Sequence, residues 1–137
     1  MSVFSPKKKR DSRERALQFL FGLDFTNYDW ESAIEDFWEA YPAADPVRQY
    51  AEELIRGVNA NLEALDAEIA GAIDKWTPDR IGKIERNILR LALYEMRHCD
   101  DVPPAVAINE AIEITKRFAS DESPRFINGV LDRLKKG

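Results

Sequence analysis

Residues 81–98 read IGKIERNILRLALYEMRH, and this stretch decides the fold. Its apolar residues recur at spacings of three and four along two faces of a helix. The first stripe is Ile81, Ile84, Ile88 and Leu91, and the second is Leu89, Leu93 and Met96. A helix that is apolar on more than one face is buried on more than one side. We therefore expect residues 79–98 to form the central helix of the protein.

Helix signals continue on both sides of this central helix. Six further amphipathic segments are predicted at about residues 11–27, 29–40, 45–58, 62–76, 105–119 and 123–134. Asp11 is expected to cap the first of them. A capping residue followed by a proline marks other starts, at Asp45-Pro46, Thr77-Pro78 and Ser123-Pro124. No convincing period-two run bounded by hairpin turns is present. The predicted fold class is all-α, with seven helices in two packed helical bundles.

The composition is that of one soluble folded domain. The 137 residues are enough to bury a core, and 45% hydrophobic with 33% charged residues argue against intrinsic disorder. No window approaches the roughly 20 apolar residues that span a membrane, and the basic start lacks the apolar segment of a secretory signal. Cys99 is the single cysteine, so no internal disulfide can form. These features predict a cytoplasmic protein that does not enter a membrane.

The net charge of −5 hides an uneven distribution. Residues 1–15 contain six basic and two acidic side chains and sum to +4, which leaves −9 for the rest of the chain. We expect residues 1–10 to form a flexible basic arm and residues 11–137 to form the helical domain. Such an arm can meet a polyanion, while the acidic body can meet a cationic partner. On charge alone, an ordinary solvated tail is the alternative.

No motif of a catalytic or metal site stands out. There is no glycine-rich phosphate loop, no zinc-ligand cluster and no credible nucleophile with its base. His98 and Cys99 are adjacent, but neighbouring residues on a helix point about 100° apart, which disfavours a catalytic pair. Glu110 and Glu113 have the spacing of solvated helix faces, and Glu113 is expected to pair with Arg117. We therefore expect a protein that is not an enzyme.

Four segments carry a specific pattern. They are RALQFLF at residues 15–21, ERNILRLALYEM at 85–96, VAINEAIEITKRF at 106–118 and SPRFINGVLD at 123–132. In their order and spacing, these segments closely resemble the NusB family. The resemblance covers residues 7–24 and 81–134 well and is loose between 25 and 75.

The resemblance implies a function in transcription. Members of the family bind the single-stranded boxA element of nascent RNA together with a small-subunit ribosomal protein also called NusE. They join the transcription elongation complex with other Nus factors and suppress premature termination in ribosomal RNA operons, without a cofactor. A ribosomal RNA cytosine methyltransferase has the same fold as its N-terminal domain, but this chain is expected to lack that enzyme's cofactor domain. A non-catalytic protein–protein adaptor with an incidental basic arm is the alternative, and monomer and homodimer are both left open.

The resemblance also implies the residues of the binding site. Residues 11–137 become an RNA-binding domain, with additional cations from the arm. The residues expected to contact RNA are Lys9, Arg10, Arg13, Gln18, Arg90, Arg125 and Phe126, and those expected to contact NusE are Phe21, Glu85 and Glu122. Cations would neutralise phosphates, and an exposed aromatic ring would stack on an unpaired base.

Some of these residues have structural alternatives. Phe126 also fits a core position in its apolar stripe. Arg90 fits an ion pair with Glu85 or Glu95 as well as an RNA contact. At position 21 the family usually has tyrosine, so a hydroxyl that could bond a partner is absent here. Gly129 costs about 1 kcal/mol inside a helix relative to alanine, and it is expected to allow close helix packing.

Overall fold

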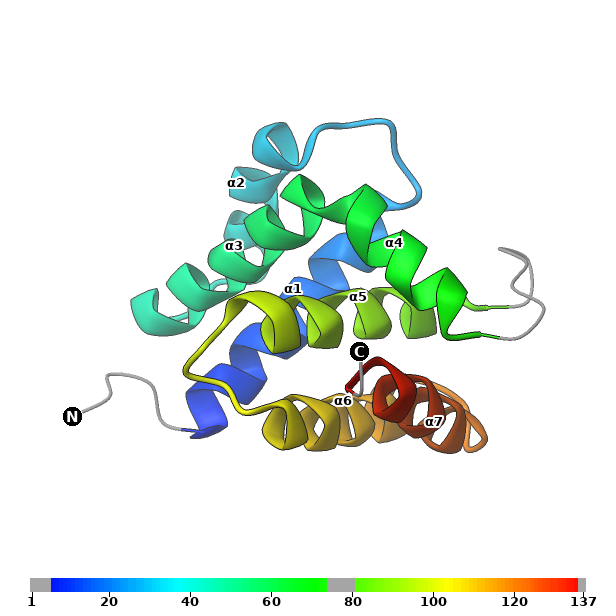
Figure 1. Ribbon diagram of the computed structural model, residues 1–137. Helices are drawn as coiled ribbons and strands as arrows, with labels where there is room; N and C mark the ends of the chain where they lie inside the picture. Colours follow the sequence, from blue (N-terminus) through cyan, green and yellow to red (C-terminus); the bar gives the residue numbers. More distant parts are fainter. Residues whose placement is uncertain (1–5, 74–80, 136–137) are drawn as a thin grey trace.

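The structure, a computed structural model, describes residues 6–73 and 81–135. Within them the chain forms seven helices and no strand, so the predicted all-α fold is confirmed (Figure 1). The helices are α1 (Pro6–Leu23), α2 (Trp30–Ala40), α3 (Asp45–Ala60), α4 (Leu62–Gly71), α5 (Lys83–His98), α6 (Pro104–Phe118) and α7 (Ser123–Lys135). The helix start expected at Thr77-Pro78 lies outside the described residues. No helix in the described part of the chain is long and apolar enough to cross a membrane.

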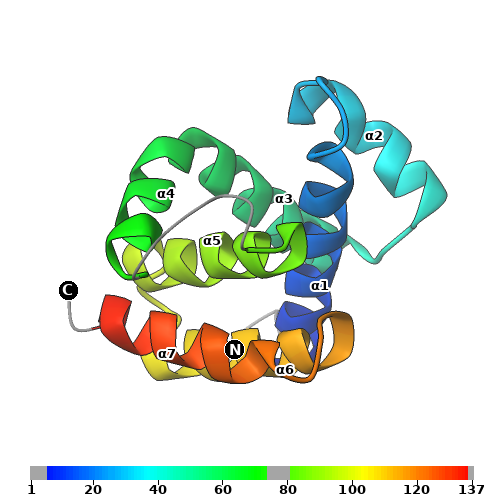
Figure 2. The ribbon, with the colours of Figure 1, turned by 90° about the vertical axis from the view of Figure 1, so that its right-hand side faces the viewer.

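Helix α5 lies in the middle of the molecule, as its two apolar stripes predicted. Figures 1 and 2 show α3 and α4 on one side of α5, and α6 and α7 on the other. Helix α1 packs against both α3 and α5, and α2 packs against α1. Helix α5 therefore packs against the helices of both predicted bundles.

The fully buried side chains come from both bundles. Leu89 and Leu93 of α5 have no exposed surface. The same is true of Leu54 and Ile55 from α3, Ile69 from α4, and Ile127 and Leu131 from α7. Burying one side chain of this size stabilises a protein by about 1.5–3 kcal/mol. This core holds the surfaces of α1, α6 and α7 in fixed relative positions.

Helix α1 begins at Pro6 and not at Asp11 as expected. Proline suits a first helical position because it has no N–H to leave unsatisfied and its φ is already helical. Residues 7–10, which were expected in a flexible arm, are therefore part of α1. The structure places no boundary at residue 10, and residues 1–5 lie outside its described part.

Close helix packing at a glycine occurs at Gly57, and the expectation for Gly129 is wrong. A Cβ at Gly57 would lie 2.0 Å from Cζ of Tyr94, so the absence of a side chain lets the Tyr94 ring lie against α3. Gly129 is exposed, and a Cβ there would meet nothing within 4 Å. Because Gly129 faces away from the core, it leaves open surface beside Phe126 instead.

Candidate nucleic-acid interface

The beginning of α1 presents cations to the surface, and two of them are paired with carboxylates. Lys9 Nζ lies 2.9 Å from Oδ2 of Asp101, in the connection between α5 and α6. Arg10 Nε donates to Oε2 of Glu110 on α6 at 2.9 Å. The hydrogen bond from Lys9 lowers the pKa of the Asp101 carboxyl, and the hydrogen bond to Glu110 raises the pKa of the Arg10 guanidinium. Both expected RNA contacts reach the surface, but both are already engaged.

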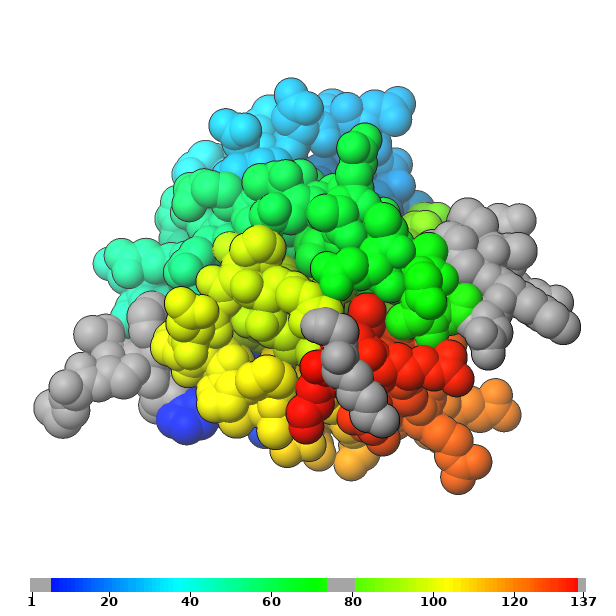
Figure 3. All heavy atoms as spheres, in the orientation of Figure 1, coloured from blue at the N-terminus to red at the C-terminus, as the bar shows by residue number. Residues whose placement is uncertain are grey.

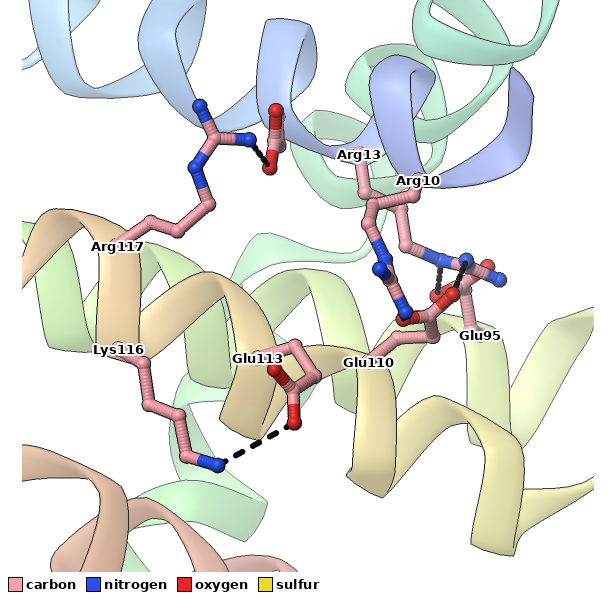
Figure 4. A network of polar contacts seen from close by, with 8 residues as sticks. Arg10, Arg13, Glu95, Glu110, Glu113, Lys116 and Arg117 are labelled. Carbon is pink, nitrogen blue, oxygen red and sulfur yellow. Dashed lines mark hydrogen bonds and ion pairs between the residues drawn. The ribbon is translucent and has the colours of Figure 1, made fainter. Parts of the chain in front are cut away.

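Arg13 lies in a buried network that joins α1, α5 and α6 (Figure 4) and extends to α3 through Tyr50. Only 4% of its side chain is exposed, and it donates from Nε to Glu95 at 2.7 Å and from Nη1 to Glu110 at 3.3 Å. Tyr50 of α3 donates its hydroxyl to the other oxygen of Glu95. Burial and the neighbouring Glu95 charge raise the pKa of Tyr50, so its proton is retained for this bond. Direct phosphate contact by Arg13 would require it to leave two carboxylates.

A further ion pair links α6 to α1. Arg117 pairs with the largely buried carboxylate of Glu14, and Figure 4 shows its side chain extending from α6 toward α1. Glu113 pairs with Lys116, with Nζ and Oε1 3.3 Å apart. The expected Glu113–Arg117 pair is therefore wrong, because Arg117 reaches a neighbouring helix that the spacing within α6 does not reveal.

The start of α7 brings three of the expected site residues together. Glu85, Glu122 and Phe126 line one pocket of about 190 Å³. Ser123 donates from Oγ to Oε2 of Glu85 at 2.9 Å and so orients that carboxylate. Phe126 is 36% exposed and lines a second pocket, of about 280 Å³, together with Arg125. Phe126 therefore lies at the surface, and the expected RNA and partner contacts meet in one place.

Gln18 and Phe21 lie further along α1. Gln18 is exposed and lines an apolar groove of about 370 Å³ between the end of α1 and α2. None of the other expected site residues lines this groove. Phe21 is half-buried, and its ring lies edge-on to that of Phe25, with centroids 5.1 Å apart. The groove therefore shares no lining residue with the pockets at the start of α7.

Arg90 is held in an ion pair, but its partner is neither of the two expected. Its Nε and Nη2 donate to the two carboxylate oxygens of Asp66 on α4 at 2.7 and 2.8 Å. Its Nη1 also donates to Oδ1 of Asn87 at 3.3 Å. Glu85 and Glu95, the expected partners, bind other side chains. Because bidentate pairs are among the strongest charged hydrogen bonds, Arg90 holds α4 against α5.

His98 and Cys99 do not form a nucleophile–base pair. His98 is exposed, and its ring stacks on Tyr94 with centroids 5.0 Å apart. Cys99 is buried, and burial raises the pKa of its thiol to about 11, so the reactive thiolate is scarce at neutral pH. No group of three potential metal ligands occurs within residues 6–73 and 81–135. The surface residues described above can bind a ligand through their charges and through stacking on the exposed ring of Phe126.

Three carboxylates that pair with the cations described above were not singled out by the sequence analysis. They are Glu14, Asp66 and Asp101. Each pairs with a cation on another helix, and Asp101 lies 92 residues from Lys9 in the chain. No periodic signal marks such a pair, because helical spacing reports only on neighbours within one helix.

The chain is similar to known proteins of one family. The model of the NusB family matches residues 10–136. The chain belongs to the NusB family. The transcription antitermination protein NusB of Desulfotalea psychrophila is 48% identical, and the match covers 93% of this chain and 94% of that protein. The protein of the same name from Listeria monocytogenes serotype 4b is 41% identical, with 93% of this chain and 95% of that protein covered.

Solved NusB structures have the same fold. NusB from T. maritima superposes with a TM-score of 0.84 at 37% identity, and the match covers 93% of this chain and 90% of that one. A crystal structure of antitermination factors NusB and NusE in complex with dsRNA gives a TM-score of 0.85 at 23% identity, with 95% and 97% covered. At that identity the likeness concerns the fold alone. The predicted family and fold are confirmed.

Proposed function

We propose that the protein is a transcription antitermination factor that binds boxA-type single-stranded RNA in nascent ribosomal RNA transcripts together with NusE. The observation that carries the proposal is the start of α7, where exposed Phe126 and Arg125 lie beside Glu85 and Glu122. The ring offers a face on which an unpaired base can stack, and the guanidinium can bind phosphate. Membership of a family whose relatives are named transcription antitermination proteins supports it.

Some of the residues proposed to bind RNA can touch it directly, whereas others can only position the helices that do. Arg125 is exposed and can neutralise a phosphate, whereas Lys9 and Arg10 can do so only by exchanging a carboxylate for it. Arg13 and Arg90 are largely buried in ion pairs with carboxylates. We therefore assign these two arginines to the positioning of α1 and α5, on which the surface contacts depend.

NusE is proposed to bind the molecule at Glu85 and Glu122. The chain beyond residue 15 sums to −9, which can attract a basic protein. A relative of the same fold has been solved with NusE and dsRNA, which supports a shared assembly. Phe21 would add an apolar contact to NusE, and Gln18 would meet RNA that continues along α1.

A titration with RNA tests the proposal. Two labelled strands of equal length and composition, one containing a boxA-like sequence and one scrambled, are titrated with the protein at one salt concentration. We expect the boxA-like strand to bind more tightly. Equal, weak binding of both strands would contradict the proposal and leave a protein–protein adaptor as the better account.

A second measurement tests the role of NusE. RNA affinity is compared with and without saturating NusE for the parent chain, Glu85→Ala and Glu122→Ala. Linkage requires RNA and NusE to tighten each other's binding by the same factor, with couplings of typically about 1–3 kcal/mol. We expect a smaller gain in each variant than in the parent. No gain in the parent chain would contradict cooperative assembly.

The proposed role is non-catalytic, uses no cofactor and belongs to the cytoplasm, where transcripts are made. The protonated state of the Cys99 thiol at neutral pH supports the absence of thiol catalysis. The adaptor alternative is favoured by one observation: Lys9 and Arg10 are paired with carboxylates, which reduces the positive charge that α1 offers to RNA.

A further inference from the structure

We infer that Asp101 sets the RNA affinity of this face by occupying Lys9, so that RNA must displace a carboxylate before Lys9 can bind a phosphate. The inference rests on the proposed function, because it concerns the same binding face. Asp101, in the α5–α6 connection, is thereby added to the RNA-binding face. Its charge is expected to lower RNA affinity, whereas the cations of the face are expected to raise it.

The Lys9–Asp101 pair lies at the edge of the molecule. Figure 3 shows the beginning of α1, in blue, emerging beside the α5–α6 connection, in yellow. The Asp101 side chain is 73% exposed, whereas that of Lys9 is 17% exposed. The Lys9 ammonium also lies 5.3 Å from the centre of the Tyr50 ring. Lys9 is thus held against the protein, and Asp101 is the member of the pair that solvent and RNA reach first.

A phosphate that approaches Lys9 meets a cation that is already neutralised. Single-stranded RNA binds cationic proteins largely through the counterions released when free cations neutralise phosphates. A paired lysine gains less, because the exchange breaks its bond to Asp101 and leaves that carboxylate close to the RNA backbone. Asp101 should therefore lower both the RNA affinity and its dependence on salt.

Asp101 is a better position than Glu110, which binds Arg10, for testing the effect of a paired carboxylate on RNA binding. Glu110 is largely buried and is shared between Arg10 and Arg13, so its removal would also disturb the buried network. Within the described residues, Lys9 is the side chain that forms an ion pair with Asp101. Removing the Asp101 charge therefore frees one surface cation and leaves the core unchanged.

Such a pair lowers the affinity for every RNA alike. Phosphate contacts add affinity for every RNA regardless of its sequence, whereas base contacts distinguish one RNA from another. By reducing the phosphate contribution at α1, Asp101 should weaken the binding of the boxA-like and scrambled strands by the same factor. The same reduction makes RNA binding depend more on a partner that brings its own cations.

The test compares Asp101→Asn with the matched control Asp100→Asn. Both remove one negative charge from neighbouring exposed positions, but no ion pair is recorded for Asp100 in the described structure. The affinity of the full chain for the boxA-like and scrambled strands is measured over a series of salt concentrations. We expect Asp101→Asn to bind both strands roughly two- to fivefold more tightly than Asp100→Asn, the range for one exposed ion pair. Its salt slope should be steeper by up to about 0.7.

A double-mutant cycle with Lys9→Gln isolates the pair. In the Lys9→Gln background, Asp101→Asn should no longer differ from Asp100→Asn. The inference is overturned if the two variants bind alike when Lys9 is present, if the gain persists without Lys9, or if no variant binds either strand. A parent chain that binds but does not prefer the boxA-like strand contradicts the proposed function alone, because the gain is expected on both strands.

Discussion

Arg13 on α1 and Arg125 on α7 were both expected to contact RNA, yet they lie in opposite environments. Arg13 is almost fully buried between Glu95 and Glu110. Arg125 is exposed, and no ion pair is recorded for it within the described residues. A positive charge in the sequence is therefore not the same as a positive charge available to a ligand. The first arginine belongs to the internal network, and the second is offered to a partner.

The same contrast separates the two parts of the proposed RNA face. Phe126 and Arg125 can bind RNA without breaking an ion pair within the described residues. Lys9 and Arg10 can bind phosphate only by exchanging Asp101 and Glu110 for it. We therefore expect the start of α7 to contribute directly and the beginning of α1 to contribute through exchange.

The largest expected effect is on stability. Arg13→Ala would leave Glu95 buried without its cation, and removing one partner of a buried pair costs about 3–5 kcal/mol. Arg125→Ala is the matched control, because the same substitution at an exposed position changes stability by less than about 0.5 kcal/mol. Urea unfolding measures both. Small and equal losses in the two variants would remove the distinction between the arginines.

A smaller effect is expected on RNA binding at Phe126. Phe126→Ala should weaken RNA binding by about 1–3 kcal/mol, the value of stacking one base on an aromatic side chain. Phe25→Ala is the control, since Phe25 is also exposed but lies in the loop after α1. Fluorescence titration of the boxA-like strand measures both variants. If the two variants bind RNA equally well, Phe126 does not stack on a base.

The smallest expected effect is on the titration of Asp101. The hydrogen bond from Lys9 holds the pKa of the Asp101 carboxyl below its ordinary value of 3.8. Because the pKa is lowered in the folded state, the pair stabilises the protein above pH 3.8, and this contribution is lost as the pH falls below it. An NMR titration of the side-chain carboxyl carbon should show the lowered pKa in the parent and a return toward 3.8 in Lys9→Gln. The same pKa in both would show that the pair does not persist in solution.

The order of the helices could be predicted because its signals are local. Apolar spacing marked α5 as the central helix, and Asp45-Pro46 and Ser123-Pro124 marked where α3 and α7 begin. Asp45 is the first residue of α3 and not its cap, which is Ala44. The start of α1 carried the same signal in Ser5-Pro6, so its true beginning could have been found by the same rule. Apart from the start of α1, the sequence analysis recovered the helix positions that local patterns determine.

The ion pairs that link α1 to α5 and α6 could not be predicted because they join distant parts of the chain. Arg13 and Glu95 are 82 residues apart, and Arg10 and Glu110 are 100 residues apart. Which cation meets which carboxylate depends on how α1 packs across α5 and α6. Spacing within one helix therefore suggested the wrong partner for Arg117.

The most direct test of the account is the position of RNA on the protein. Amide chemical shifts of the full chain are followed by NMR as boxA-like RNA is added. We expect the largest changes in residues 7–13 and 122–128, and little change in residues 29–41, which contain five acidic and no basic side chains. Changes centred on residues 29–41, or none in residues 122–128, would contradict the account.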